Sequence, residues 1–199
     1  IGNSDIYAKD KEGIDAAALK DNKVCVIGVA AVTNPKSKVE SLTKKQLIDI
    51  FTGKIKNWKE VGGADMKVTV INRPKSSGTR ATFKEFALDK KEEVAGLTQD
   101  SSGAVKQAVK QTDGAISYLA LSYFADAANK EGLNILKIDG VSANAENIST
   151  DKYKVWAYEH MYTKGEPTEI TKAFLDYMVS PEMKAGITKL GYIPMADMK

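Results

Sequence analysis

The chain has 199 residues, a formal net charge of +3, and 43% hydrophobic and 28% charged residues. This length can bury a sizeable core in one or two domains, and the composition is typical of an ordinary globular protein. Because the lysines alternate with acidic residues, the sequence lacks the concentrated basic charge of a nucleic-acid-binding protein. The single cysteine, Cys25, excludes an internal disulfide, and the apolar run at 24–32 is too short to span a bilayer.

Strand and helix patterns alternate along the chain. The chain is expected to begin with a strand end that enters a loop at 1–7. Strands are expected at 24–32 (buried), 67–72, 114–118, 134–138 and 153–162, and a loop at 140–151. Helices are expected at 13–21 (short), 43–53, 79–88, from Ser101-Ser102 onward, at 119–129, at 170–178 and from Ser180-Pro181 to Gly191. This alternation predicts an α/β protein with mostly parallel sheets. The two long apolar strands, at 24–32 and 153–162, flank a central block, which suits two lobes joined by two crossing strands.

The segment Arg73-Pro74-Lys75-Ser76-Ser77-Gly78-Thr79-Arg80 joins a predicted strand to a predicted helix. It brings an arginine and a Ser-Gly turn to a helix N-terminus, where backbone N–H groups lack intrahelical partners and the helix dipole is positive. A tetrahedral oxyanion fits such a site. The residues alone leave another interpretation open, in which Ser77 only caps the helix and Arg73 forms a surface ion pair.

Five motifs follow one another along the chain: Gly2-Asn3-Ser4-Asp5, Ile50 to Trp58 (IFTGKIKNW), Asn72 to Arg80 (NRPKSSGTR), Asp113 to Tyr118 (DGAISY) and Leu190 to Pro194 (LGYIP). In the same order, they resemble the G-x-S-D turn, the IFxGxIxxW segment, the R-x-x-x-S-G-T phosphate loop, the GAIGY segment and the LGYxP segment of bacterial phosphate-binding proteins. Those proteins are the extracytoplasmic receptors of the high-affinity phosphate ABC transporter. The resemblance covers essentially the whole chain.

The resemblance implies an α/β, two-lobe periplasmic-binding-protein-like architecture with two crossing strands and a ligand cleft. Residues 1–32 and 156–199 would form the terminal lobe, and residues 33–155 the middle lobe. The family begins with a strand–helix–strand–helix stretch before the G-x-S-D turn, on the order of 60 residues at about 30 per βαβ unit. Because this sequence starts at that turn, we expect the first lobe to be incomplete.

The resemblance also implies which residues contact phosphate: Ser4, Asp5, Arg73, Ser77, Gly78 and Thr79. Asp5 is chemically informative, because a carboxylate repels an oxyanion unless it accepts a proton that the anion carries. Hydrogen phosphate carries such a proton and fully ionised sulfate does not, so Asp5 would select phosphate. Arg73 would supply a planar, two-pronged donor. The residues alone also permit Asp5 to be a turn or N-cap aspartate.

One position departs from the family pattern. Many members carry an acidic residue two positions after the loop arginine, where it orients that arginine, but this chain has Lys75. Lys75 either adds positive potential at the mouth of the cleft or is a solvated side chain. Arg73 then needs another orienting group, which the sequence does not identify.

Several other residues that could serve in a functional site are expected to have structural roles only. His160 is the only histidine and has no second His or Cys as a metal-site partner, so we expect no metal site and no cofactor. The motifs G-x-S-x-G, H-E-x-x-H and G-x-x-x-x-G-K-[ST] are absent. We expect Trp58 and Trp156 in the core or between the lobes, and the lysines between 36 and 59 on a solvated surface.

The resemblance therefore implies a non-catalytic, extracytoplasmic solute-binding protein that captures inorganic phosphate by hinge closure. It would present the phosphate to the permease subunits of an ABC transporter and would be tethered to the membrane by a lipid outside this chain. Two alternatives stay open: a phosphate-ester hydrolase that uses the Ser77-Gly78-Thr79 loop, and an adhesion or signalling module on the same scaffold. A receptor for another tetrahedral anion is a variant of the main interpretation.

Overall fold

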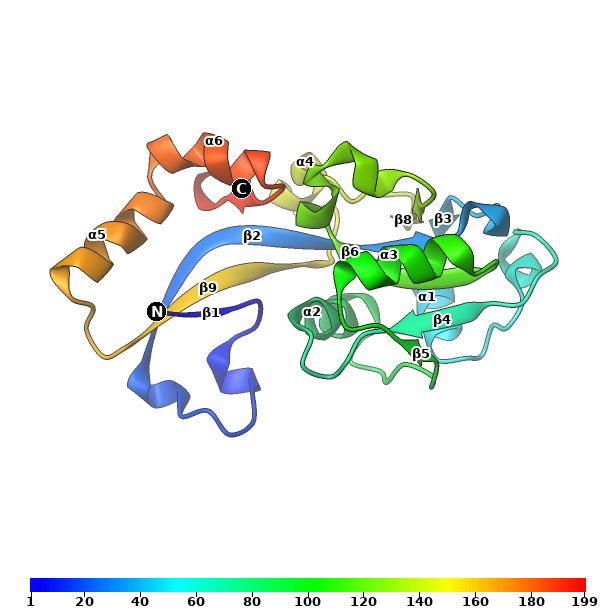
Figure 1. The fold of residues 1–199 in the computed structure, drawn as a ribbon, viewed down its shortest axis with the longest axis horizontal. Helices are drawn as coiled ribbons and strands as arrows, with labels where there is room; N and C mark the ends of the chain where they lie inside the picture. The colour runs from blue at the N-terminus through cyan, green and yellow to red at the C-terminus, as the bar shows by residue number, and fades with distance from the viewer.

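Two long antiparallel strands, β2 (Leu19–Thr33) and β9 (Trp156–Lys164), run along the molecule (Figure 1). The computed structural model describes residues 1–199. The other strands are β1 (Gly2–Ser4), β3 (Ser41–Leu42), β4 (Thr69–Asn72), β5 (Leu97–Thr98), β6 (Ala115–Ala120), β7 (Asn134–Ile135), β8 (Lys137–Ile138) and β10 (Ile193–Pro194). The α-helices are α1 (Lys44–Phe51), α2 (Gly78–Ala87), α3 (Ser102–Gln111), α4 (Ala145–Ser149), α5 (Glu169–Met178) and α6 (Pro181–Lys189).

Strand β2 changes partners along its length. From Leu19 to Gly28 it pairs with β9, and from Val29 to Thr33 it pairs with β6, both in antiparallel register. β4 lies parallel to both β6 and β5, which gives the sheet order β1-β9-β2-β6-β4-β5. The sheet is therefore mixed, and the prediction of mostly parallel pairing was wrong. The apolar run in β2 is buried because layers cover both of its faces, and such burial does not fix the direction of the neighbouring strands.

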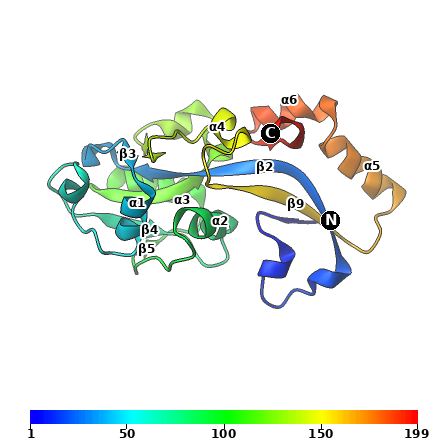
Figure 2. The ribbon, with the colours of Figure 1, turned by 180° about the vertical axis from the view of Figure 1, so that it is seen from behind.

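Helices cover both faces of the part of the sheet that contains β4 and β6 (Figures 1 and 2). On one face, α1 and α2 contribute to a core of 23 buried residues, in which the rings of Phe83 and Tyr118 stack with centroids 4.4 Å apart. On the other face, α3 supplies Val105 and Val109 to a core of eight buried residues. Near α5 and α6, the third cluster has only three buried residues. Most of the core therefore lies around β4 and α2, which flank residues 73–77.

Most helices begin at the caps that the sequence predicts. Thr43 forms both bonds of a capping box before α1, Ser77 caps α2 and Ser101 caps α3. α6 begins at Pro181, although the Ser180 hydroxyl forms no capping bond. None of these helices combines the length and the apolar character that a bilayer crossing needs.

Two predicted helices were wrong. Residues 13–21 contain only a 3-10 turn at Ala16–Ala18, after which the chain enters β2. The segment 119–129 begins as the end of β6 and continues as two 3-10 helices, Leu121–Ala125 and Ala127–Lys130. In both segments, pairing with a neighbouring strand takes residues that the helical pattern had included, because tertiary contacts override local propensity.

Two further segments differ in detail from their patterns. The strand predicted at 134–138 is divided between β7, which pairs with β2, and β8, which pairs with β3. The loop predicted at 140–151 contains the short helix α4. Trp58 is a core residue as predicted, since it is fully buried and its Nε1 donates a hydrogen bond to the Gly114 carbonyl at 2.9 Å.

Candidate functional site

Residues 73–79, which we call the anion loop, run from the end of β4 into the first turn of α2. The Ser77 hydroxyl accepts a hydrogen bond from the Arg80 N–H at 3.2 Å and so caps the helix. Ser77 is therefore the N-cap that the sequence permitted, and its hydroxyl proton is still available for donation. The first turn of α2 directs N–H groups and the positive end of the helix dipole toward the loop. The loop thus has the backbone geometry of an anion site.

Arg73 is buried, with 9% of its surface exposed, at the start of the anion loop. Its Nη2 donates a hydrogen bond to the Asp100 carbonyl at 3.2 Å, whereas its buried Nε and Nη1 contact no acceptor. The alternative that Arg73 forms a surface ion pair was wrong. A buried guanidinium with two unpaired nitrogens is costly unless an acceptor reaches it, and an oxyanion is the acceptor that best fits its two-pronged geometry.

Lys75 takes no part in orienting Arg73. Its side chain is exposed and forms no ion pair, as a solvated lysine does. The Asp100 carbonyl, from the segment before α3, contacts the guanidinium instead. A backbone carbonyl leaves no trace in a sequence motif, so the sequence could not identify it.

Asp5 lies directly against the N-terminus of α2, although it is far from Gly78 in the sequence. A Cβ atom placed on Gly78 would lie 2.2 Å from the Asp5 Oδ2 atom, so any side chain at position 78 would displace the carboxylate. The resemblance predicted this approach, and no local pattern could have done so. The acceptor group of Asp5 and the N–H donors of α2 therefore face one small region, where a ligand with both a proton and negative oxygens would find a partner for each.

The two remaining predicted residues differ in their surroundings. Thr79 lines a cavity of about 200 Å³ together with Asp5. Ser4 is engaged locally, because its hydroxyl donates to the Ile6 carbonyl at 2.8 Å and accepts from the Ile6 N–H at 3.2 Å. Ser4 therefore shapes the turn that carries Asp5. Arg73 and Ser77 are buried and do not line this cavity.

The cavity also contains residues that the sequence analysis did not select: Thr82, Ser102, Ser122, Glu159 and Tyr192. Burial, and then the charge of Asp5, raise the pKa of Glu159 from 4.5 to about 8. This carboxyl has no ion-pair partner, so it is neutral near pH 7 and can donate a proton. An acidic residue inside an otherwise apolar strand pattern was the one signal that could have identified it.

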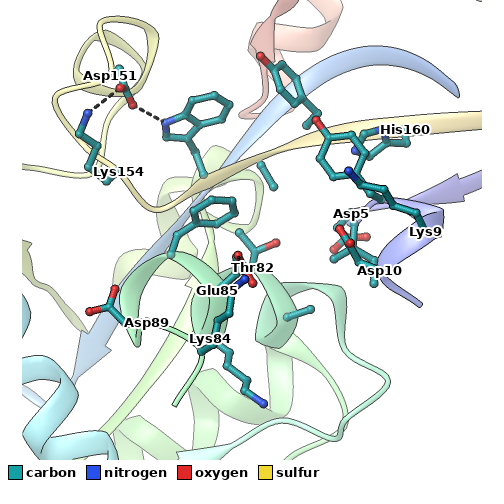
Figure 3. A pocket seen from close by; sticks show the side chains of 18 of the residues that line it. Asp5, Lys9, Asp10, Thr82, Lys84, Glu85, Asp89, Asp151, Lys154 and His160 are labelled. Carbon is teal, nitrogen blue, oxygen red and sulfur yellow. Dashed lines mark hydrogen bonds and ion pairs between the residues drawn. The ribbon is translucent and has the colours of Figure 1, made fainter. Parts of the chain in front are cut away.

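A larger cleft of about 1020 Å³ separates α2 from β9, and Asp5 lines both spaces (Figure 3). His160 borders this cleft but is itself buried, with its Nδ1 2.7 Å from the Asp21 Oδ1 atom. Its ring stacks on Tyr162 and contacts Tyr7, with centroids 5.5 Å and 4.5 Å away. No group of three or more metal-ligating side chains occurs in the structure. The surroundings of His160 are those of a structural side chain.

The structure does not favour an ester hydrolase. A nucleophilic serine needs a general base within hydrogen-bond reach. The Ser77 hydroxyl instead contacts the Arg80 N–H, and the only histidine pairs with Asp21 on β2. The histidine is therefore engaged elsewhere and is not the base that would activate Ser77.

Comparisons with known proteins identify the family of the chain. The family model of the PBP superfamily domain matches residues 1–182. The phosphate-binding protein PstS of Bacillus subtilis (strain 168) is 54% identical over 200 residues, which cover 100% of this chain and 65% of that protein. The PstS protein of Borreliella burgdorferi is 32% identical over 193 residues, which cover 92% of this chain and 68% of that protein. This chain thus spans about two thirds of the length of these relatives.

A solved structure is similar as well. A putative phosphate ABC transporter substrate-binding protein from Clostridium perfringens, crystallised with bound phosphate, superimposes with a TM-score of 0.84 at 33% identity, covering 98% of this chain and 78% of that one. The match therefore extends from the anion loop to the crossing strands. The chain belongs to the PBP superfamily and, within it, to the family of PstS phosphate-binding proteins.

Proposed function

We propose that this chain binds inorganic phosphate at the N-terminus of α2, through the anion loop and Asp5. The observation that carries the proposal is the buried Arg73 guanidinium, whose Nε and Nη1 contact no protein acceptor. Thr79, Ser77 and the backbone of Gly78 supply further donors around the same helix end. Ser4 contributes by holding the turn that carries Asp5.

Asp5 would make the site selective for phosphate over sulfate. The carboxylate is close to the first residue of α2, so a bound anion must lie near it. A hydrogen phosphate can donate its proton to Asp5. Sulfate has no proton to donate, so its negative charge is repelled by the negative Asp5 carboxylate. The selectivity therefore comes from a penalty on the competing ligand.

The site suits capture and release better than chemistry, and we infer a non-catalytic solute-binding protein with two lobes, residues 1–32 with 156–199, and residues 33–155. Strand β2 pairs with β9 as far as Gly28 and with β6 of the second lobe from Val29 onward, so β2 and the chain that leads into β9 would connect the lobes. The lobes would close about these strands around the anion. A closed site excludes water, which strengthens the hydrogen bonds to phosphate.

Membership of the family supports a proposal about partners and location. The Clostridium perfringens relative is described as a substrate-binding protein of a phosphate ABC transporter. We propose that this chain likewise delivers phosphate to the permease subunits of an ABC transporter. It would act outside the cytoplasmic membrane, tethered there by a lipid that is attached outside these residues.

Calorimetric titration of the phosphate-stripped chain with phosphate and with sulfate tests the proposal. We expect heat with phosphate only, and loss of binding in Arg73→Ala. In Asp5→Asn, the ratio of phosphate to sulfate affinity should fall by at least about tenfold, which corresponds to roughly 1.4 kcal/mol. A folded chain that releases heat with neither anion would contradict the proposal.

A matched glycine pair separates binding from folding. Gly78→Ala should weaken phosphate binding, because the new methyl group displaces the Asp5 carboxylate. Gly103 lies in the first turn of α3, where a Cβ would meet only the Tyr123 hydroxyl at an ordinary 3.8 Å. Gly103→Ala should therefore leave binding unchanged. Equal effects of the two changes would mean that Asp5 is not part of the site.

A further inference from the structure

A buried ion pair joins Arg80, the last residue of the Asn72 to Arg80 motif, to Glu93, which lies outside every motif. Arg80, in the first turn of α2, has 15% of its side chain exposed, and its Nε is 2.6 Å from the Glu93 Oε2 atom. Glu93 comes from the segment between α2 and β5, and its side chain is fully buried. The same guanidinium donates from Nη1 to the Arg73 carbonyl at 3.0 Å. Arg80 thus connects Glu93 to the backbone of the phosphate-loop arginine.

A second contact joins the same two segments. The Asn72 side chain donates from Nδ2 to the Val94 carbonyl at 2.9 Å. Asn72 is therefore held directly by Val94, and Arg73 is held by Glu93 through Arg80. The side chain of Arg73 has only one protein hydrogen bond, to Asp100, so its direction depends on how firmly its backbone is held.

The pair is expensive for a purely structural link. A buried carboxylate loses its hydration, and an apolar contact would fasten the segment without that cost. Burial raises the pKa of Glu93, while the Tyr118 hydroxyl and Arg80 beside it favour the charged form. The segment is also attached elsewhere, since the Val94 N–H donates to the Phe51 carbonyl at 2.7 Å. Neither Glu93 oxygen has a hydrogen-bond partner, so the contact with Arg80 is a close ion pair. A buried charge with this cost is explained if it holds the Arg80 guanidinium in place.

We propose that Glu93 and Arg80 are positioning residues for phosphate binding. Glu93 fixes the Arg80 guanidinium, which fixes the Arg73 carbonyl and hence the direction of the Arg73 side chain. Glu93 thus acts on Arg73 through Arg80 and the loop backbone, and it does not contact the Arg73 guanidinium itself. The inference rests on the proposed phosphate function.

The test compares Glu93→Gln and Arg80→Lys with the wild-type chain. Glu93→Gln removes the charge that holds Arg80. Arg80→Lys keeps a positive charge but lacks the planar guanidinium, whose Nε lies beside Glu93 while its Nη1 donates to the Arg73 carbonyl. Each change should weaken phosphate binding by about tenfold or more, at temperatures well below unfolding. The double variant should bind about as weakly as the weaker single variant, since both changes break one connection.

Glu92→Gln is the matched control. Glu92 is adjacent in sequence and 3.8 Å from the Arg80 Nη2 atom, but its side chain is 67% exposed. Removing its charge should change phosphate affinity less than twofold, because exposed ion pairs contribute little. A weakening equal to that of Glu93→Gln would overturn the inference in favour of a general effect of charge.

Thermal unfolding of the phosphate-free variants separates positioning from stability. A merely structural pair predicts a lower Tm with unchanged phosphate affinity in Glu93→Gln and Arg80→Lys, and that result would also overturn the inference. If the wild-type chain itself binds no phosphate in this assay, the proposed function fails and the inference fails with it. Binding by the wild type with weaker binding by both variants supports both.

Discussion

Among single residues, Glu159 illustrates how burial sets a charge state at the site. Its carboxyl lines the cavity beside Asp5, opposite Cys25 in the strand register, and no cation lies beside it. Burial and Asp5 raise its pKa to about 8 in the folded chain, against 4.5 in the unfolded chain. Burial, and then Glu159, also raise the pKa of Cys25 to about 12, so the thiol stays protonated.

The sign of the effect on stability follows from these two values. Between pH 4.5 and about 8, Glu159 keeps a proton in the folded chain that it has released in the unfolded chain. The free energy of unfolding is therefore highest below pH 4.5 with respect to this group, and it falls as the pH rises toward about 8. Glu159→Gln removes this loss and should raise the Tm by a few degrees at pH 8.5, with little change at pH 4.5. Thermal unfolding at both pH values checks this, with the exposed Glu12→Gln as control. Equal Tm values for wild type and Glu159→Gln at pH 8.5 would contradict it.

The sequence could predict part of the site at this scale. The anion loop was a candidate because of its local pattern, whereas Asp5 was assigned only through the resemblance to the phosphate-binding family. The Asp100 carbonyl and Glu93 could not be identified, because each reaches the site through tertiary structure and shows no local pattern. Glu159 showed only one signal, an acidic residue inside an apolar strand pattern. Whether the six predicted residues contact phosphate remains the prediction that calorimetry tests.

At the scale of secondary-structure elements, helix capping before α1, α2 and α3 is the local sequence signal that the structure confirms. In α1, the Gln46 N–H donates to the Thr43 hydroxyl at 3.1 Å, and the Thr43 N–H donates to the Gln46 side chain at 2.9 Å. Such bonds depend only on neighbours in the sequence, so they are predictable. The segments at 13–21 and 119–129 had helical patterns without this support, and β2 and β6 extend into them.

Caps also give a prediction about stability. Thr43→Ala removes one bond of the capping box and should cost about 1 kcal/mol, or about 2–4 °C in Tm. Ser180→Ala is the matched control, because Ser180 precedes α6 at the same position but forms no capping bond. Thermal unfolding of both variants should show a loss only for Thr43→Ala. Equal losses would mean that the capping box contributes nothing specific.

At the scale of the whole molecule, the crossing of β2 and β9 determines how the proposed lobes can move. The partner of β2 changes after Gly28, and a Cβ on Gly28 would lie 2.4 Å from the Ile148 Cδ1 atom of α4. Strand β2 is therefore tightly packed against α4 where its partner changes, and we expect the proposed lobes to bend about this point. The sequence could predict two crossing strands from their length and apolar character, but not their antiparallel pairing, which depends on the path of the chain between them.

If the lobes close on phosphate, the molecule becomes more compact. Small-angle X-ray scattering should then show a smaller radius of gyration in phosphate than in sulfate at equal ionic strength. Arg73→Ala should show no difference between the two anions, since it lacks the donor that holds phosphate. A ligand shifts a conformational equilibrium only by its differential affinity for the two states, so an anion bound by one lobe alone cannot drive closure. Heat of phosphate binding with an unchanged radius of gyration would therefore mean that a single lobe holds the anion.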